Sequence, residues 1–353
     1  MKATFKFISL FICICLLTCL SACRINSSSF RAFNTFVYID TYGQTFSKTQ
    51  EKEIQNTLIS LENTFSATKE GSFLSKINGA KNGQVINANA FEREIFALAT
   101  EFYTFSQGKF NPAVYPLLKL WGFAPKYPVL NFTPPTDQAL LSASSYTDFS
   151  MVSLTQNGVT KTIDNLQIDF GGFLKGYATD LVGKALSSSG ITKGYVSMGG
   201  SSLYLLSVES VSVNHPEKSG ESILSVVGSS LNNYSVSTSG TYERFYTIDG
   251  VNYSHIIDAS TGKPSQKNIL SATIICKDGA FADAMTTALC LCDFNPISPT
   301  ANQLVDFIND IVERYQEAQI FVVYNNGEHK NIITNANSQA FSLLDLEYTP
   351  VYI

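Results

Sequence analysis

The sequence is poor in positive charge, in histidine and, beyond residue 23, in cysteine. It has 24 Lys+Arg against 29 Asp+Glu, only three His, and no run of basic residues in 353 positions. Nucleic-acid binding is therefore not expected, because nucleic-acid-binding surfaces concentrate Lys and Arg. Of the seven cysteines only Cys276, Cys290 and Cys292 lie beyond residue 23. Their odd number argues against a disulfide framework, and we expect these thiols to pack in the core.

The first residues are typical of a signal peptide. Lys2 and Lys6 precede an apolar run, FISLFICICLLTCL, which is too short for a stable membrane span. The ending Leu20-Ser21-Ala22-Cys23 resembles the lipobox of bacterial lipoproteins, in which the cysteine is lipidated and becomes the first mature residue. A plain secretory signal or an uncleaved anchor is the alternative.

The lipobox predicts a signal peptide over 1–22, a lipid on Cys23 and a Ser-rich tether over 23–32. Loss of the two lysines of the signal leaves a mature charge of 22 − 29 = −7. Such a chain is anchored to a bacterial membrane on the periplasmic or cell-surface side and does not span it.

The remaining pattern predicts one domain over 33–353. Apolar residues recur at helical spacing over 54–65, behind a Ser47-Lys48-Thr49-Gln50 capping box, and again over 91–102 and 304–315. Between about 150 and 280, alternation and turn signals predict strands, including a hairpin that turns at Asp249-Gly250. Hairpins mixed with long helices argue for an α+β fold with a largely antiparallel sheet flanked by helices.

Polar residues gather in islands beside glycines. The first is IDFGGFLKGYATD, Ile168 to Asp180, in which Asp169 is expected to end a strand and Lys175 to begin a helix after a paired-glycine turn. The N-terminus of such a helix can hold an anion. The spacing matches neither a dinucleotide fingerprint nor a phosphate loop, and a plain strand-to-helix turn is the alternative.

Two further islands carry aromatic and titratable groups. Residues 237–240 in SVSTSGTYERFY are too small and polar for a good central strand, so they are expected to close a strand beside a ligand. His255 in YSHIIDASTGKP is either a catalyst or a structural histidine. Trp121, the only tryptophan, lies in KFNPAVYPLLKLWGFAP and either stacks on a planar ligand or packs in the core.

The helix FADAMTTALCLC places a carboxylate and a hydroxyl on one face. Asp283 and Thr287 are one turn apart, and both are hard oxygen ligands of the kind that Mg²⁺ binds. Mg²⁺ also keeps waters and borrows ligands from substrate phosphates. The alternative is structural: Thr287 bonds back to a helical carbonyl and Asp283 pairs with a lysine.

Taken together, these islands resemble the motifs of the FAD:protein FMN transferase (ApbE) family of bacterial lipoproteins, from about Phe33 to the C-terminus. The motifs occur in the family's order and approximate spacing, and several in register are far more specific than any one. They are Phe110-Asn111-Pro112, Leu120-Trp121-Gly122-Phe123, Asp169-Phe170-Gly171-Gly172, Lys175-Gly176-Tyr177, Ser197-Met198-Gly199-Gly200, Thr238-Ser239-Gly240, Ser254-His255-Ile256-Ile257-Asp258, and Ala282-Asp283 with Thr287.

The resemblance implies a T-fold-like ApbE architecture and a Mg²⁺-dependent transfer of FMN from FAD. A threonine hydroxyl of an exported or membrane redox protein would attack the phosphorus on the FMN side, and AMP would leave. The implied metal ligands are Asp283, Thr287 and the carbonyl of Gly172, and His255 is the candidate general base. The implied FAD contacts are Phe33, Thr68, Trp121, Gly122, Phe123, Asp169, Lys175 and Ile257.

The sequence departs from the family pattern at three places. After His255 it reads Asp258-Ala259-Ser260-Thr261-Gly262 where the family usually has Asp-Pro-Arg-Thr-Gly, so a contact made by that arginine is missing. Ser201 stands where Asp or Asn is common, and Thr68 where an aromatic residue is frequent. The alternatives to the transferase are a Mg²⁺-dependent FAD pyrophosphatase, which uses water in place of threonine, and a flavin-binding lipoprotein without turnover.

Overall fold

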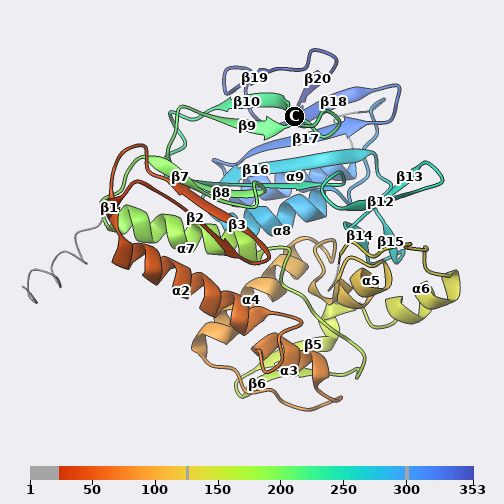
Figure 1. Cartoon of the computed structure of the whole chain (residues 1–353). Helices are drawn as coiled ribbons and strands as arrows, with labels where there is room; N and C mark the ends of the chain where they lie inside the picture. Colours follow the sequence, from red (N-terminus) through yellow and green to blue (C-terminus); the bar gives the residue numbers. More distant parts are fainter. Residues whose placement is uncertain (1–23, 125–126, 299–301) are drawn as a thin grey trace, which may run out of the picture.

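A nine-stranded sheet lies at the centre of the computed structural model, which describes residues 24–124, 127–298 and 302–353 (Figure 1). In spatial order the strands are β2 (Ser27–Ala32), β3 (Thr35–Asp40), β7 (Gly194–Met198), β8 (Ser202–Ser207), β11 (Tyr234–Gly240), β16 (Ile269–Cys276), β17 (Gln319–Asn325), β18 (Lys330–Thr334) and β20 (Thr349–Tyr352). Neighbours are antiparallel except β18 and β20. The predicted α+β class with a largely antiparallel sheet is confirmed.

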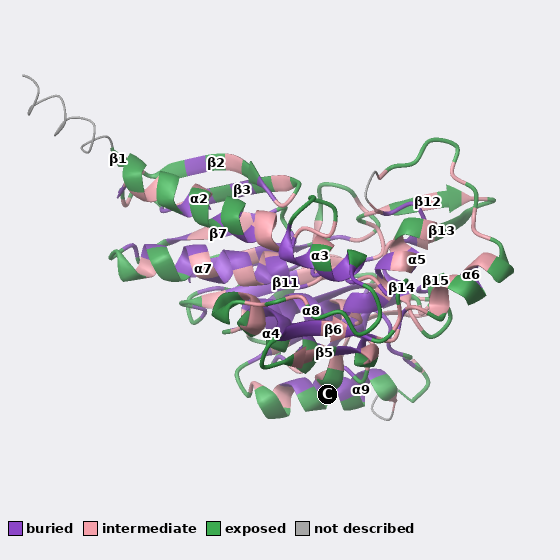
Figure 2. Cartoon of the chain, turned by 90° about the horizontal axis from the view of Figure 1, so that it is seen from below, coloured by how far each residue is buried: buried purple, intermediate pink, exposed green. Residues whose placement is uncertain are grey.

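Helices cover one face of this sheet and enclose the main core. The α-helices of the described residues are α2 (Lys48–Phe65), α3 (Phe73–Gly79), α4 (Ala90–Phe105), α5 (Tyr115–Leu120), α6 (Asp137–Ser144), α7 (Leu174–Ser188), α8 (Gly279–Leu289) and α9 (Gln303–Arg314). α7 and α8 pack side by side on β8, β11 and β16, while α2 contacts α7, and α4 and α9 contact α8. Figure 2 shows α8 buried along its length, whereas α2 and α4 bury one stripe.

A second core lies on the opposite face of the sheet. There a small sheet of β9 (Ser210–Asn214), β10 (Ser222–Val227) and β19 (Phe341–Leu343) covers β11, β16 and β17. Because strand side chains alternate between faces, Val236 and Ile275 enter this second core while Ser235 and Cys276 face the helices. The sheet is thus buried on both faces over its central strands.

Short elements complete the fold around the helical side. Two-residue to four-residue strands form the pairs β1 (Arg24–Ile25) with β4 (Phe46–Ser47), β5 (Val152–Thr155) with β6 (Gly158–Lys161), β12 (Phe245–Ile248) with β13 (Val251–Ser254), and β14 (Ile257–Asp258) with β15 (Lys263–Pro264). Two 3₁₀ turns, η1 (Pro112–Val114) and η2 (Phe149–Met151), precede α5 and β5. The predicted turn at Asp249-Gly250 joins β12 to β13, with both residues at positive φ.

Local signals placed several elements correctly. The Ser47 hydroxyl accepts the Gln50 N–H at 3.1 Å, and the Gln50 side chain accepts the Ser47 N–H at 2.8 Å, which is the predicted capping box at the start of α2. The three cysteines beyond residue 23 are free and buried, as expected. In the described part of the chain no helix is long and apolar enough to cross a bilayer.

The N-terminal region differs from the predicted tether. Residues 1–22 and Cys23 lie outside the described residues, but Ser27–Ala32, within the expected tether, form β2 at the edge of the main sheet. The serines that suggested a flexible linker alternate between an exposed face and a buried one in this strand, since Ser28 is 7% exposed.

Two strand predictions are wrong for identifiable reasons. Residues 237–240 do close a strand, β11, but against expectation this strand is central, between β8 and β16, because small side chains are needed where α7 and α8 press against the sheet. Asp169 does not end a strand, because the segment before it bonds to a side chain and not to another strand. The Asn78 amide donates to the Ile168 carbonyl at 2.9 Å and accepts the Ile168 N–H at 2.7 Å, in place of a neighbouring strand.

The packing of α7 on α8 requires two glycines. A Cβ added to Gly176 would lie 1.9 Å from the Gly279 carbonyl oxygen and 2.9 Å from Asp283 Cβ. A Cβ on Gly279 would lie 2.7 Å from the Gly176 carbonyl oxygen and 2.5 Å from Asp180 Oδ1. The two helices therefore touch backbone to backbone at their N-terminal ends.

We predict that Gly176→Ala lowers the free energy of unfolding by roughly 3 kcal/mol, because the new methyl group must separate two packed helices. Gly79→Ala is the matched control: Gly79 also lies in a helix, and its added Cβ meets nothing within 4 Å. Its effect should stay within about 1 kcal/mol. Urea denaturation measures both, and equal effects would contradict the close contact.

Candidate active site

The candidate site lies where the N-terminal ends of α7 and α8 meet the turn at Ser201, directly before β8. The Lys175 ammonium donates to the Ser201 hydroxyl at 2.8 Å and lies 3.7 Å from Asp283 Oδ1. The other oxygen of Asp283, Oδ2, accepts the Gly176 N–H at 3.0 Å. The fold therefore brings together two opposite charges, Lys175 and Asp283, which are 108 residues apart in the sequence.

Asp283 is a buried carboxylate whose negative charge is only partly balanced by its neighbours. It is 3% exposed, and burial raises its pKa, although Lys175 and the Gly176 N–H act in the opposite direction. A cation bound beside it would favour its charged form. The structural alternative for this motif included an ion pair between Asp283 and a lysine, and Lys175 makes that pair. The 3.7 Å separation is too long for a hydrogen bond from Lys175 to Oδ1.

The second half of that alternative, a bond from the Thr287 hydroxyl back to a helical carbonyl, is not found in the described residues. Its hydroxyl pairs with Ser239 Oγ at 3.2 Å, while its neighbour Thr286 donates back to the Asp283 carbonyl at 2.9 Å and also pairs with Ser239 at 2.9 Å. Thr287 is the one residue of α8 that is only partly buried. Its oxygen is therefore held by a neutral hydroxyl and faces the same side as Asp283.

The turn before α7 offers a third oxygen. In a regular helix the Gly176 N–H would bond the carbonyl four residues earlier, which is that of Gly172. Here Asp283 takes this N–H, and among the described residues no hydrogen bond to the Gly172 carbonyl is found. Asp283, Thr287 and Gly172 thus present one charged and two neutral hard oxygens, a donor set that fits Mg²⁺. No group of three or more His, Cys, Asp or Glu in the described ranges could hold a metal instead.

His255 lies beyond the β12–β13 hairpin with an unusual environment. Its Nδ1 is buried without a hydrogen-bond partner among the described residues, and its ring meets that of Phe123 at 6.2 Å. Burial lowers the pKa of His255 to about 3, and the positive charges of Arg244 and Lys175 act in the same direction. The imidazole is therefore neutral at pH 7.

Arg244 is a residue of this site that the sequence analysis did not single out. The His255 N–H donates to its carbonyl at 3.0 Å, and its guanidinium donates to the Phe123 carbonyl and lies 4.7 Å from the centre of the Tyr127 ring. Its charge partly offsets the burial that raises the pKa of Asp169. The glycine-flanked stretch STSGTYERFY was the available signal, since an arginine beside a polar island is a candidate ligand contact.

The segment around Trp121 packs as a small satellite core. Trp121 is 2% exposed, donates its indole N–H to the Gly262 carbonyl at 2.8 Å and stacks on Tyr253 at 5.4 Å. This packing differs from the interpretation that the ring stacks on a ligand, because the ring and its N–H are already engaged. Phe123 and Ile257 are buried in the same cluster.

Gly122 follows Trp121 at φ 71°, and its carbonyl accepts the Tyr246 hydroxyl at 3.0 Å. Phe33 and Thr68, the remaining predicted contacts, are not joined to the charged cluster by any contact found in the described residues. Phe33 turns the chain between β2 and β3 at φ 53°, and Thr68 is exposed after α2.

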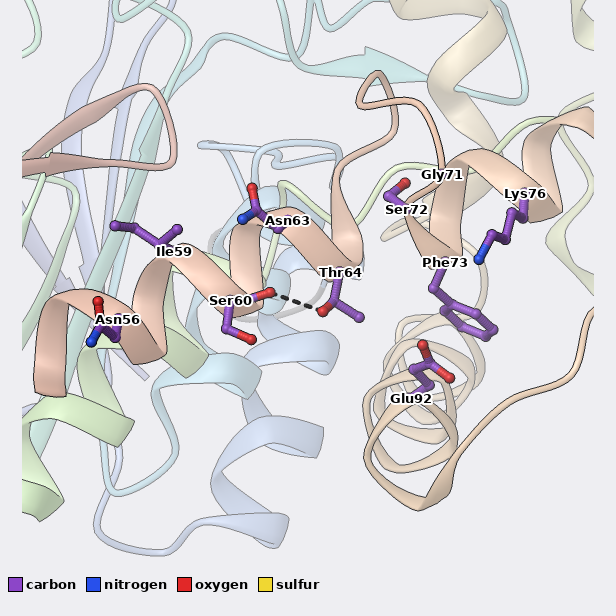
Figure 3. Close-up of a pocket in the computed structure, with 10 residues that line it drawn as sticks. All are labelled: Asn56, Ile59, Ser60, Asn63, Thr64, Gly71, Ser72, Phe73, Lys76 and Glu92. Carbon is purple, nitrogen blue, oxygen red and sulfur yellow. Dashed lines mark hydrogen bonds between the residues drawn. The ribbon is translucent and has the colours of Figure 1, made fainter.

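A surface pocket of about 380 Å³ lies elsewhere, between α2 and the start of α3 (Figure 3). It is lined mainly by polar side chains, including Asn56, Asn63, Ser72, Lys76 and Glu92, and the Thr64 hydroxyl donates to the Ser60 carbonyl within it. None of the predicted site residues lines it. This pocket is therefore separate from the predicted site residues.

Comparisons with known proteins agree with this architecture. The model of the ApbE family matches residues 33–308. The chain is 32% identical to the FAD:protein FMN transferase of Chlamydia muridarum over 271 residues, 72% of this chain and 81% of the relative. It is 29% identical to that of Vibrio cholerae over 257 residues, 71% and 76% of the two chains. The solved ApbE protein of Thermotoga maritima, at 26% identity, gives a TM-score of 0.71 and covers 86% of this chain and 94% of its own. The flavin transferase ApbE of V. cholerae shares the fold with a TM-score of 0.73.

We predict that His255 reduces stability at acid pH. The unfolded histidine binds a proton near pH 6.5 but the folded one only near pH 3, so wild-type stability should fall, relative to a His255→Gln variant, as pH drops from about 6.5 toward 3. Urea denaturation at several pH values measures this difference. NMR of the imidazole gives a direct check: a titration midpoint near 6.5 for His255 in the folded protein would overturn the assignment.

Proposed function

The chain belongs to the ApbE family, and on this basis we propose that it is a Mg²⁺-dependent FAD:protein FMN transferase. It moves FMN from FAD to a threonine of an exported or membrane redox protein and releases AMP. The observation that carries the proposal is the pairing of Lys175 and the Asp283 carboxylate at the N-terminus of α7, together with the neutral oxygens of Thr287 and Gly172 that hold no strong bond among the described residues. Such a site suits a cation together with a pyrophosphate.

The metal would be held by Asp283, Thr287 and the Gly172 carbonyl. Bound Mg²⁺ supplies positive charge that offsets the negative charge of the pyrophosphate. The chain's own residues prepare the same region: Lys175 adds a fixed cation, and Asp283 stays oriented because its Oδ2 is bound to the Gly176 N–H. Positioning and charge neutralisation supply most of the acceleration in phosphoryl transfer.

His255 is the proposed base for the acceptor hydroxyl. A neutral imidazole is the form that accepts a proton, and its pKa of about 3 is low because the site carries positive charge and little solvent. The phosphates of bound FAD bring negative charge to the same region and raise that pKa. His255→Ala should therefore lower the transfer rate with little loss of FAD affinity.

The discriminating experiment is incubation with FAD, Mg²⁺ and a threonine-bearing acceptor. A transferase yields flavinylated acceptor and AMP. An FAD pyrophosphatase yields free FMN and AMP, and a binding protein leaves FAD unchanged. Separation of the products by chromatography, with mass spectrometry of the acceptor, distinguishes the three, and either of the last two results would overturn the proposal.

The two side-chain ligands should respond unequally to substitution. Asp283→Asn keeps size but removes the charge, so Mg²⁺-dependent transfer should be lost while the fold remains. Thr287→Val keeps shape and removes one neutral oxygen, so it should weaken metal affinity by roughly tenfold, and raised Mg²⁺ should rescue it by mass action. Activity assayed across a Mg²⁺ series, with thermal melts as control, tests this. Activity of Asp283→Asn equal to wild type would exclude the metal role.

The sequence before residue 24 supports attachment by a lipid on Cys23, outside the cytoplasm of a bacterium. The lipobox is the basis for this part of the proposal. Fatty-acid labelling of the wild type but not of Cys23→Ser, with release of that variant from the membrane, is the expected result. Labelling of both chains would contradict it.

A further inference from the structure

The outer face of the main sheet at β2 and β3 carries exposed aromatic side chains in the described part of the chain. In β3, Val37 and Ile39 point into the core while Phe36 and Tyr38 point outward, with 59% and 39% of their surface exposed. Tyr42, just beyond the strand, is 51% exposed. Figure 2 shows the exposed stretches along β2 and β3. Isolated exposed aromatics are ordinary, but three at one side of the sheet, two on β3 and one directly after it, form a patch that calls for an explanation.

These side chains are ordered by contacts with one another. Tyr195 of β7 lies 5.9 Å from Tyr38 and 6.1 Å from Tyr42, ring centre to ring centre. At the other end of the row the Arg31 guanidinium of β2 lies 5.0 Å from the centre of the Phe36 ring. We call the set Phe36, Tyr38, Tyr42 and Tyr195, with Arg31, the aromatic face.

The remaining residues of this face are small. β2 presents Ser27 and Ser29 on the same side as Arg31, and Ser197 of β7 lies opposite Tyr38. Asp40 is the carboxylate on this side of β3, and it accepts the Tyr42 N–H at 2.9 Å. A serine-lined sheet face with projecting aromatic rings is less charged than an ordinary solvent-facing surface.

The chain enters the domain beside this face. β1, which begins at Arg24, pairs with β4, and the Thr41 N–H donates to the Asn26 carbonyl at 3.0 Å. Tyr42 follows Thr41 directly, so the first described residue and the first ring of the aromatic face share one end of the sheet. Since Arg24 is bonded to Cys23, a lipid on Cys23 would leave no spacer between the membrane and the domain.

We propose that the aromatic face docks on the phospholipid interface of the membrane that holds the lipid anchor. Tyr and Phe rings partition to the headgroup region, where an apolar body and a polar tip are both solvated, and Arg31 can reach lipid phosphates. The inference rests on the lipid attachment proposed above for its geometry. Because the face has one arginine and no basic cluster, docking depends on the rings and only weakly on salt.

Docking in this way places the candidate active site close to the bilayer. The aromatic row ends at Phe36, whose carbonyl accepts the Gly199 N–H at 2.9 Å. The glycine turn that begins there leads within two residues to Ser201, the partner of Lys175. A membrane-bound acceptor would thus reach the site close to the bilayer surface. Neither partner would need a long tether.

Depth-dependent fluorescence quenching tests the orientation. The lipidated protein is reconstituted into phosphatidylethanolamine and phosphatidylglycerol vesicles that contain brominated acyl chains. Phe36→Trp should be quenched at least threefold more than Leu141→Trp, a control on α6 that is 69% exposed. Trp121 is 2% exposed and gives the same background in both. Equal quenching of the two variants would overturn the proposal.

A second measurement removes the lipid and isolates the face itself. In a Cys23→Ser background, Phe36→Ser/Tyr38→Ser/Tyr42→Ser should sediment with the same vesicles at least fivefold less than its parent, with little change between low and high salt. Leu130→Ser/Leu141→Ser/Leu346→Ser, which alters three exposed leucines outside the face, should bind like the parent. Failure of the parent to bind vesicles, or a concentration-dependent dimer without vesicles that the aromatic triple variant abolishes, would contradict docking on lipid. FAD turnover is not needed for either measurement, so loss of docking and loss of transfer are separately visible.

Discussion

The backbone contact between α7 and α8 is the constraint on which the candidate site depends. Gly176 and Gly279 allow the two helix ends to approach closely enough for each helix to supply a carboxylate to the other. Asp283 of α8 accepts the Gly176 N–H at 3.0 Å, and Asp180 of α7 accepts the Gly279 N–H at 3.1 Å. Each acid lies at the positive end of the opposite helix, where a negative charge is favoured. A larger residue at either glycine would break both contacts together.

The central strand β11 is adapted to the same contact. Its serines face α7 and α8, where bulkier side chains would push the helices away from the sheet. Ser235 donates to Asp180, and Ser239 pairs with the hydroxyls of Thr286 and Thr287. Small polar residues in the middle of a sheet are weak strand formers, but here they hydrogen-bond the Asp180 carboxylate and the hydroxyls of Thr286 and Thr287. The strand therefore contains residues of low strand propensity at the positions that contact α7 and α8.

The buried titratable groups of the site are held toward their neutral forms, so charged ligands from outside the chain would change their protonation. Burial raises the pKa values of Asp169 and Asp283 and lowers that of His255, with Arg244 and Lys175 as the nearby cations. Acidic and basic groups are thus both shifted toward their neutral forms. A bound cation would favour the carboxylates, and a bound pyrophosphate would favour the imidazolium. These opposite shifts are typical of a functional site.

The sequence alone determined the fold class, the capping box of α2, the hairpin at Asp249-Gly250 and the family, because each follows from local periodicity, local turn chemistry or ordered motifs. It also supplied Asp283, Thr287 and Lys175 as candidates through residue type and spacing. Only the tertiary structure decided that Lys175 pairs with Asp283, that Trp121 is enclosed by Tyr253, that Arg244 adjoins His255, and that the serines of β11 form a central strand. Each of these depends on contacts between distant parts of the chain, and local propensity carries no information about which surfaces will meet. The burial that sets the charge state of the site is likewise a property of the packed helices and not of the residues taken singly.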